Sequence, residues 1–178
     1  MFTYKEQSKE KVEEYLEKIQ GIPEEKIVSI DETGIQQYLC REYAYAPRGE
    51  KVYDTISGRK FKRLNIVAAK QGNTVLSPLQ YECSMTKELF ESWFEKFLLP
   101  ELPENFVLVM DNASFHRKKR LHEIAQNHQM ILIFLPPYSP ELNPIEKEWA
   151  NLKQGLASHL RLFSNLDDAV SYYFKVNL

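Results

Sequence analysis

Three acidic residues, Asp31, Asp111 and Glu146, are the candidates for chemistry in this sequence. Asp31 and Asp111 each end a short, largely apolar stretch that predicts a buried strand. Glu146 lies just after an Asn-Pro pair that predicts a helix start. Carboxylates gathered without a basic partner repel one another, and a divalent cation relieves that repulsion. Since hard cations prefer oxygen ligands, we expect a metal site at these three residues.

Each acid also has an alternative interpretation. An Asp at the end of a strand is commonly a turn former. Glu146 occupies the third helical position after Asn143, where it could complete a capping box instead of binding a metal. Two neighbouring acids, Glu32 and Glu148, are possible substitutes for Asp31 and Glu146.

The elements that would carry the acids predict a mixed α/β sheet with helices on its faces. After the strand that ends at Asp31, residues 64–69 and 74–81 predict a β-hairpin, with its second strand at a sheet edge because it contains a proline. Right-handed crossovers make the later strands ending at Asp111 and Leu135 parallel to each other.

The sequence makes specific predictions for two of the helices that pack on this sheet. An aromatic and leucine stripe from Leu89 to Leu98 predicts a helix that ends at Pro100 and whose aromatic side chains lie in the core. A final helix is expected to start near Ser164, with Asp167 in capping position.

Three motifs of this chain resemble the signatures of a known family. The motifs are Asp31-Glu-Thr-Gly, Asp111-Asn-Ala-Ser-Phe-His116 and Pro137-Tyr-Ser-Pro-Glu-Leu-Asn-Pro-Ile-Glu146. They are similar to those of the DDE transposases of the mariner superfamily, in its bacterial insertion-sequence branch. The 34 residues between Asp111 and Glu146 match the DD34E spacing of that branch, and the resemblance covers roughly residues 26–160.

The resemblance implies a ribonuclease H-like fold and a DNA-processing enzyme. Such an enzyme hydrolyses DNA at the ends of an element and joins the freed 3′-hydroxyl to target DNA, using two Mg²⁺ ions, with Mn²⁺ as a substitute. Asp31 would bridge the two ions, and Asp111 and Glu146 would each hold one. Two alternatives stay open: a ribonuclease H-like nuclease without strand transfer, and a non-catalytic DNA-binding remnant of a transposase.

Basic residues suggest where DNA could bind. The net charge of −2 excludes a uniformly basic surface, so contacts must come from local patches. The patches comprise Arg59, Lys60, Lys62, Arg63, Arg117, Lys118 and Arg120. The second patch, Arg117, Lys118 and Arg120, lies in the first turn of a predicted helix. The helix dipole disfavours cations at that end, and a bound anion would compensate their charge. A run of charges is more often a solvated surface, which is the alternative for each patch. His116, beside the second patch, could orient a phosphate, although a histidine packed in the core is the commoner case.

At 178 residues the chain is long enough for one domain and short for two. Residues 1–22 predict an amphipathic lead-in helix and linker, and residues 23–178 the ribonuclease H-like catalytic domain, with an insertion at about 33–62. In the family such an insertion contacts DNA and a partner subunit, which implies a homodimer; the alternative is a locally packed hairpin. The family also implies a helix-turn-helix recognition domain, which would here be separate.

No stretch approaches the roughly 20 apolar residues of a membrane span, and the amino terminus does not have the pattern of a signal peptide. We therefore expect no membrane partner and a cytoplasmic protein. The resemblance to bacterial insertion-sequence transposases implies that it is nucleoid-associated and bacterial.

Overall fold

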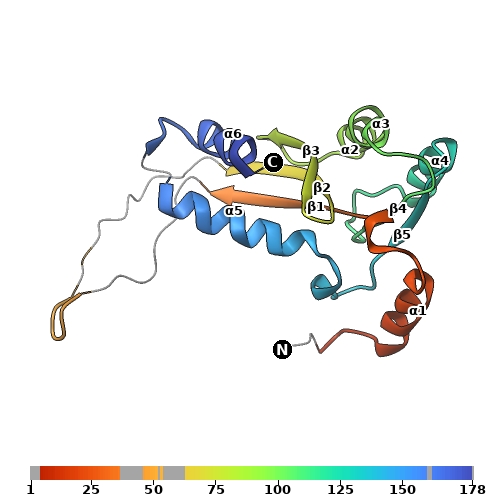
Figure 1. The fold of residues 1–178 in the computed structure, drawn as a ribbon, viewed down its shortest axis with the longest axis horizontal. Helices are drawn as coiled ribbons and strands as arrows, with labels where there is room; N and C mark the ends of the chain where they lie inside the picture. Colours follow the sequence, from red (N-terminus) through yellow and green to blue (C-terminus); the bar gives the residue numbers. More distant parts are fainter. Residues whose placement is uncertain (1–4, 37–45, 52, 54–62, 160–161, 178) are drawn as a thin grey trace.

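The computed structural model of the chain describes residues 5–36, 46–51, 53, 63–159 and 162–177. A five-stranded sheet forms its centre (Figure 1). The strands are β1 (Ile27–Gln36), β2 (Arg63–Gln71), β3 (Thr74–Tyr81), β4 (Val107–Met110) and β5 (Ile131–Phe134). The helices and short helical turns are α1 (Lys9–Ile19), η1 (Glu24–Lys26), α2 (Lys87–Trp93), η2 (Phe94–Leu98), α3 (Leu99–Glu101), α4 (Lys118–Asn127), η3 (Pro140–Leu142), α5 (Ile145–His159) and α6 (Leu166–Asn177).

The sheet is mixed, as the sequence predicted. Its strand order is β3-β2-β1-β4-β5; β1, β4 and β5 are parallel, and β2 and β3 run antiparallel to their neighbours. Ile30 of β1 pairs with Met110 of β4. Asp31 and Asp111 directly follow this residue pair. The two acids therefore lie side by side where the pairing between β1 and β4 ends.

β1 is longer than the sequence predicted, and this corrects the expected strand end at Asp31. Residues 32–36 continue the strand because they pair with residues 63–67 of β2. Thr33 and Ile35 are buried on one face, in the two-residue alternation that a strand imposes. Asp31 therefore lies within a strand, at the point where its parallel neighbour β4 has ended.

The predicted hairpin is present between β2 and β3. Its turn has Gly72 at a φ of 55°, a conformation that glycine adopts without a Cβ penalty. β3 is an edge strand, as Pro78 required. The register between the two strands shifts near Ser77, whose φ is 46°, so the proline sits at a bulge.

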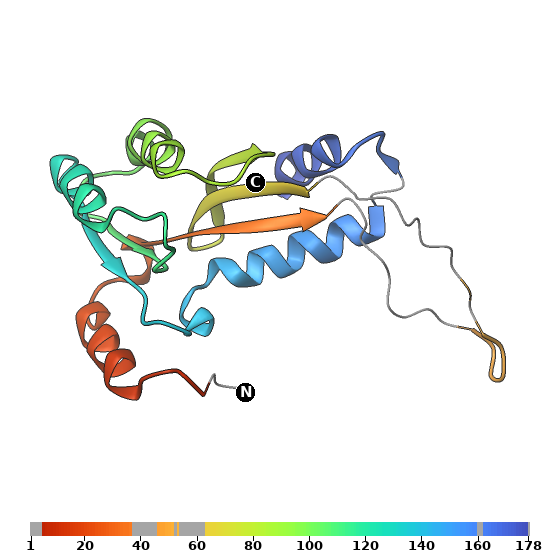
Figure 2. The same cartoon turned by 180° about the vertical axis from the view of Figure 1, so that it is seen from behind.

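One face of the sheet packs against α2, η2, α3 and α4 (Figure 2). Side chains such as Phe90 and Phe94 contact Val28 and Ile30 of β1 in this core. Two expectations for this helical segment are wrong. The helix continues past Pro100 to Glu101, and Phe97 is 59% exposed. Because η2 is a π-helical turn, it changes the angular spacing of side chains and turns Phe97 outward.

The opposite face packs against α5 and α6. The buried side chains of α5 are Ile145, Trp149, Leu152 and Leu156, which recur every three or four residues and so lie on one face of the helix. α6 begins at Leu166 and is capped by Asn165, whose Oδ1 accepts a 2.8 Å hydrogen bond from the Asp168 amide. The expected cap at Asp167 is therefore wrong.

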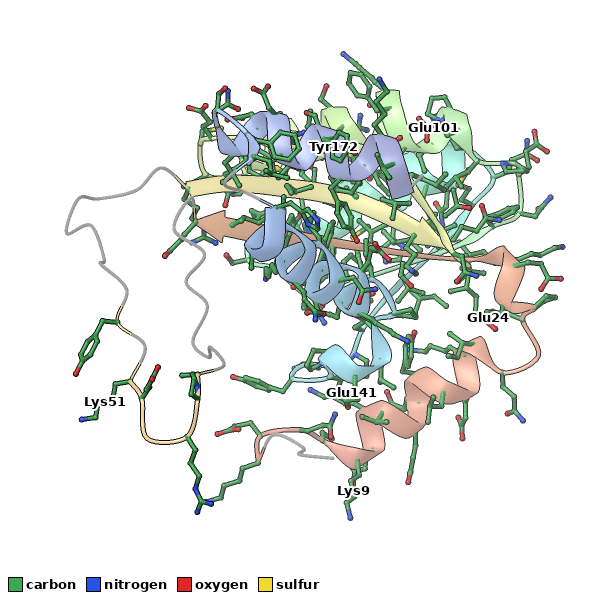
Figure 3. The ribbon with its side chains drawn as sticks, turned by 60° about the vertical axis from the view of Figure 1, so that its left-hand side comes forward. Lys9, Glu24, Lys51, Glu101, Glu141 and Tyr172 are labelled. Carbon is green, nitrogen blue, oxygen red and sulfur yellow. The ribbon has the colours of Figure 1, made fainter. Side chains whose placement is uncertain are left out.

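The lead-in helix α1 contacts the sheet. Tyr15 is 5% exposed and packs with Val107, Val109 and Leu135. Before the helix, Nε2 of Gln7 donates a 2.8 Å hydrogen bond to Oγ of Ser139 and another to the carboxylate of Glu141. Figure 3 shows Glu141 on η3, next to the segment that leads into α1. The lead-in segment thus holds the loop that precedes α5.

Most of the expected insertion falls outside the described residues. Residues 37–45, 52 and 54–62 belong to this part, so the choice between an arm and a packed hairpin stays a prediction. The described residues 46–51 contain a turn in which the amide of Glu50 donates to the carbonyl of Pro47. Among the described helices, none combines the length and the apolar character needed to cross a membrane.

Candidate active site

Asp31 faces α5 from inside the sheet. Its Oδ2 accepts a 3.0 Å hydrogen bond from the indole Nε1 of Trp149. The bond joins strand β1 to the helix that carries Glu146, three residues before the tryptophan. Such a bond could not be predicted from the sequence, because a stripe of apolar side chains does not indicate where an indole N–H points.

Asp111 begins the loop after β4 and is half exposed. Its Oδ1 accepts a 3.0 Å hydrogen bond from the amide of Ala113, a turn that Asp commonly forms. The neighbouring Asn112 donates to the carbonyl of Leu135, which fixes this loop against the residue after β5. Asp111 therefore forms a turn, as its alternative interpretation predicted, and also lies beside Asp31.

Glu146 lies in the first turn of α5, and its side chain is exposed. The capping box expected as the alternative is not formed among the described residues. Oδ1 of Asn143 is buried without a hydrogen-bond partner there, while its Nδ2 lies 3.5 Å from the carbonyl of Ile30. Asn143 thus ties the start of α5 to β1 and leaves the carboxylate of Glu146 available.

The electrostatics of Asp31 connect the three acids. Burial raises the pKa of Asp31 to about 8, and the charge of Glu146 is the next largest cause. The charges of Glu32 and Asp111 raise this pKa further. The carboxylates therefore lie close enough to repel one another, which is the situation that a divalent cation relieves.

The two substitute acids are used elsewhere. Glu32 points to the opposite face of the sheet from Asp31, because successive residues of a strand alternate, and it lies beside His116. Glu148 forms a 3.1 Å ion pair with Lys70 and accepts a 3.1 Å hydrogen bond from the Tyr173 hydroxyl. Burial, followed by the charge of Glu148, raises the pKa of Tyr173 to about 12.

His116 packs in the core on the Glu32 side of the sheet. Its side chain is 2% exposed, and its ring lies 4.4 Å from that of Phe90 and 4.5 Å from that of Phe115. This agrees with the packed interpretation of the histidine. Its ring nitrogens nevertheless face two acids, Glu32 and Asp111.

The donor set fits a divalent metal by its chemistry. Asp31 and Asp111 each have one oxygen in a hydrogen bond described above, which leaves carboxylate oxygens of both, and of Glu146, for a hard cation. Across the described residues, however, no three His, Cys, Asp or Glu side chains are gathered closely enough to hold a metal ion. The acids adjoin one another without forming a closed ligand sphere.

The basic residues expected to bind DNA differ in their surroundings. Arg59, Lys60 and Lys62 lie outside the described residues. Arg63 is exposed at the start of β2, and its guanidinium lies directly over Gly34, where a Cβ would be 2.3 Å from Nε. Glycine at this position therefore leaves room for the arginine.

The residues that open α4 are largely paired with acids of the protein itself. Arg117 donates two hydrogen bonds of 2.7 and 2.6 Å to the carboxylate of Glu91. Lys118 contacts Oδ1 of Asn112 and lies 4.9 Å from the centre of the Phe134 ring. Arg120 is 3.6 Å from Glu123. Carboxylates thus compensate part of the charge for which the sequence analysis expected a bound anion.

A cavity of about 590 Å³ adjoins Glu146. It lies between the β2–β3 turn, η3 and the first turns of α5, and its polar lining includes Lys70, Asn73, Lys147 and Asn151. The sequence analysis missed these residues, since they come from segments that are distant in sequence and carry no shared motif.

The sheet has mixed strands in this order and helices on both faces, with Asp31 inside β1 and Asp111 directly after the parallel strand β4. This is the architecture of the ribonuclease H-like fold. The chain belongs to the DDE superfamily endonucleases, whose family model matches residues 26–169. This match covers strand β1 with Asp31, the loop after β4 that begins with Asp111, and the helix that carries Glu146.

Solved structures of the mariner transposase Mos1 share the fold. Its paired-end complex with Mn is similar with a TM-score of 0.75 and 16% identity over 98% of this chain and 57% of that one. A pre-cleavage Mos1 transpososome is similar with a TM-score of 0.72 and 14% identity, covering 98% of this chain and 57% of that one. The predicted ribonuclease H-like fold is thereby confirmed.

Two relatives match in sequence over shorter stretches. An uncharacterized protein of Sinorhizobium fredii, y4pE/y4sA, is 39% identical over 66 residues, which are 37% of this chain and 46% of the relative. The Tc1 transposase of Caenorhabditis elegans is 29% identical over 83 residues, 47% of this chain and 29% of the relative. The matched part of each relative is therefore less than half of its length.

Proposed function

We propose that this chain is the catalytic domain of a transposase, which cleaves DNA at the ends of an element and joins the freed 3′-hydroxyls to target DNA. The observation that carries the proposal is the buried carboxylate of Asp31, which is adjacent to Asp111 through the β1–β4 register and is repelled by Glu146. Catalytic acids are often held in such strained electrostatic surroundings. Membership of the DDE superfamily endonucleases supports the reaction class.

In this proposal Asp31, Asp111 and Glu146 hold two divalent ions, Mg²⁺ or Mn²⁺. When bound, such ions supply charge neutralisation at the attacking and leaving oxygens of a phosphodiester. Trp149 orients the carboxylate of Asp31 through its indole N–H. Water is the nucleophile in end cleavage, and the freed 3′-hydroxyl is the nucleophile in strand transfer.

The finer assignment is to the bacterial insertion-sequence branch of the mariner superfamily, of the DD34E type. The 34 residues between Asp111 and Glu146 and the partial similarity to a protein of Sinorhizobium fredii support it. The proposal includes a bacterial, nucleoid-associated location. It also includes a division into the lead-in segment 1–22 and the catalytic domain 23–178.

We further propose transposon ends and target DNA as partners, with a homodimer and a helix-turn-helix recognition domain acting together with this catalytic domain. Solved relatives of the fold include a paired-end complex with a left transposon end. Alone, the chain should bind DNA weakly and without sequence preference, with an affinity that falls steeply as salt increases. Tight binding to one inverted repeat by this chain alone would contradict that expectation.

The test is Mn²⁺-dependent nicking of supercoiled plasmid by the chain and its variants. Asp111→Asn and Glu146→Gln should abolish nicking while remaining folded. Glu148→Gln is the matched control, because Glu148 lies on the same helix but pairs with Lys70. Nicking at the wild-type rate by folded Asp111→Asn would refute the site. Nicking without any joining of a 3′-hydroxyl oligonucleotide would favour the nuclease alternative.

A further inference from the structure

The acids Asp31 and Glu32 are neighbours in sequence but lie on opposite faces of β1. Asp31 is bonded to Trp149 on the α5 face. Glu32 is on the face covered by α2 and α4, where the ring of His116 lies beside it. The proposed function uses the first of these faces and assigns no role to the Glu32–His116 pair.

His116 lies between Glu32 and Asp111. Its Nδ1 is 3.2 Å from the backbone oxygen of Asp111 and 3.6 Å from Oδ1 of the same residue. Its Nε2 is 3.9 Å from Oε1 of Glu32. Because a carbonyl oxygen only accepts, the short contact makes Nδ1 the protonated nitrogen. The imidazole therefore links the backbone at Asp111 to a carboxylate on the far side of the sheet.

The contact on the Glu32 side is incomplete. Among the described residues, Nε2 of His116 and Oε1 of Glu32 are both buried without a hydrogen-bond partner. A buried polar atom without a partner costs about 1–3 kcal/mol. With Nδ1 protonated, a hydrogen bond between Nε2 and Oε1 needs one more proton, on the imidazole or on the Glu32 carboxyl, together with a small closing movement. Catalytic hydrogen bonds are often long before ligands bind and shorten afterwards.

The surroundings restrict how His116 could act. Its side chain is 2% exposed, whereas that of Asp111 is 48% exposed. The aromatic rings of Phe90 and Phe115 pack against the imidazole and restrict its movement. His116 therefore cannot reach DNA itself, and it acts on whatever Asp111 binds only through Asp111.

We propose that Glu32 and His116 are positioning residues that hold Asp111 in the orientation needed to bind a divalent cation. The inference rests on the proposed function of Asp111. The amide of Ala113 fixes one carboxylate oxygen from the loop, and the imidazole restrains the backbone and the same carboxylate from behind. Residues that orient metal ligands in this way typically alter metal affinity 10–100-fold when replaced, according to known metal sites.

The experiment compares His116→Phe and Glu32→Leu, which remove the polar contacts, with Glu32→Gln, which retains a hydrogen-bonding group. His122→Phe is the matched control, because His122 also packs against an aromatic ring, that of Phe134. Two quantities are measured on the full chain. They are the Mn²⁺ concentration that half-saturates thermal stabilisation, and the concentration that gives half-maximal plasmid nicking.

We expect His116→Phe and Glu32→Leu to raise both Mn²⁺ concentrations by about 10–100-fold. Glu32→Gln should recover most of the wild-type affinity, and His122→Phe should match the wild type. Unchanged Mn²⁺ dependence in folded His116→Phe or Glu32→Leu would overturn the inference. If these two variants do not fold, Glu32→Ala replaces them and is compared with Glu32→Gln. Equal Mn²⁺ affinities of these two folded variants would overturn the inference.

The same measurements separate this inference from the proposed function. Suppose that Asp111→Asn loses nicking, whereas His116→Phe nicks DNA with the Mn²⁺ dependence of the wild type. This result would reject only the positioning role. A wild-type protein that neither nicks DNA nor is stabilised by Mn²⁺ would overturn both. A purely structural histidine would lower the melting temperature without changing the Mn²⁺ concentration needed for half-saturation.

Discussion

The indole of Trp149 donates a 3.0 Å hydrogen bond to Oδ2 of Asp31, and this bond ties helix α5 to strand β1 beside the candidate active site. A second tryptophan provides a comparison on the other face of the sheet. Nε1 of Trp93 donates a 2.8 Å hydrogen bond to the carbonyl of Ser77. Both indoles are buried, with exposed fractions of 1%, so only their acceptors distinguish them.

Trp149→Phe should therefore impair the site as well as the fold. Loss of a hydrogen bond to a carboxylate and of ring volume should lower the free energy of unfolding by about 2–3 kcal/mol, measured in urea. Trp93→Phe should cost a similar amount. Only Trp149→Phe should raise the Mn²⁺ concentration needed for nicking, and equal effects of both variants on that concentration would contradict a role in orienting Asp31.

Stability without metal should decrease as pH rises. Because burial, and then Glu146, raises the pKa of Asp31 to about 8, the native state binds a proton that the unfolded state releases above its ordinary value of 3.8. The free energy of unfolding should then fall between about pH 4 and pH 8 and level off above that range. Urea titrations in a chelator at several pH values measure this slope.

Asp31→Asn should flatten that pH dependence. Asparagine still offers an oxygen to Trp149 but carries no charge, so the variant should exceed the wild type at pH 8 by on the order of 1–3 kcal/mol. Added Mn²⁺ should stabilise the wild type at pH 8 and have little effect on the variant. A wild type whose stability is constant from pH 4 to 8 would show that the carboxylate of Asp31 is not strained.

Arg117 should contribute more to stability than to DNA binding. Its two hydrogen bonds to Glu91 hold the start of α4 against α2, and Glu91 is 12% exposed in its side chain. Arg117→Gln should lower the melting temperature and change DNA affinity little. Lys119→Gln, at an exposed position in the same helical turn, should lower DNA affinity and leave the melting temperature unchanged.

Fluorescence anisotropy with a duplex at several salt concentrations, together with thermal melting, measures both effects. Removing a phosphate contact should reduce the slope of affinity against salt, whereas removing an internal ion pair should not. If Arg117→Gln weakens DNA binding as much as Lys119→Gln and melts at the wild-type temperature, the arginine leaves Glu91 to bind phosphate.

Gln7 should stabilise the loop that precedes α5. Gln7→Leu removes donors to Ser139 and Glu141, so it should lower the free energy of unfolding by about 1 kcal/mol. Gln20→Leu, at the other end of α1, is the control and should have a smaller effect. Amide hydrogen exchange of residues 138–142 should become faster in Gln7→Leu. Unchanged exchange there would show that the lead-in segment does not stabilise the loop.

Much of the architecture was determined by the sequence. Continuous apolar stretches around Val109 and Ile133 predicted buried parallel strands, and the turn at Gly72 predicted the hairpin, because these features depend on local chain geometry and on period. The same patterns placed acids after Met110 and near the start of α5. They could not find the true end of β1, since that end depends on pairing with residues 63–67 from a distant segment.

What each acid faces was decided only by the tertiary structure. Asp31 and Glu32 are adjacent and chemically similar, but the pleat of β1 directs one to Trp149 and the other to His116. Likewise, Glu148 differs from Glu146 in having Lys70 within 3.1 Å. Motif and spacing specify which residues are present, whereas burial and neighbouring charges, which set the pKa of Asp31, arise only when distant segments pack together.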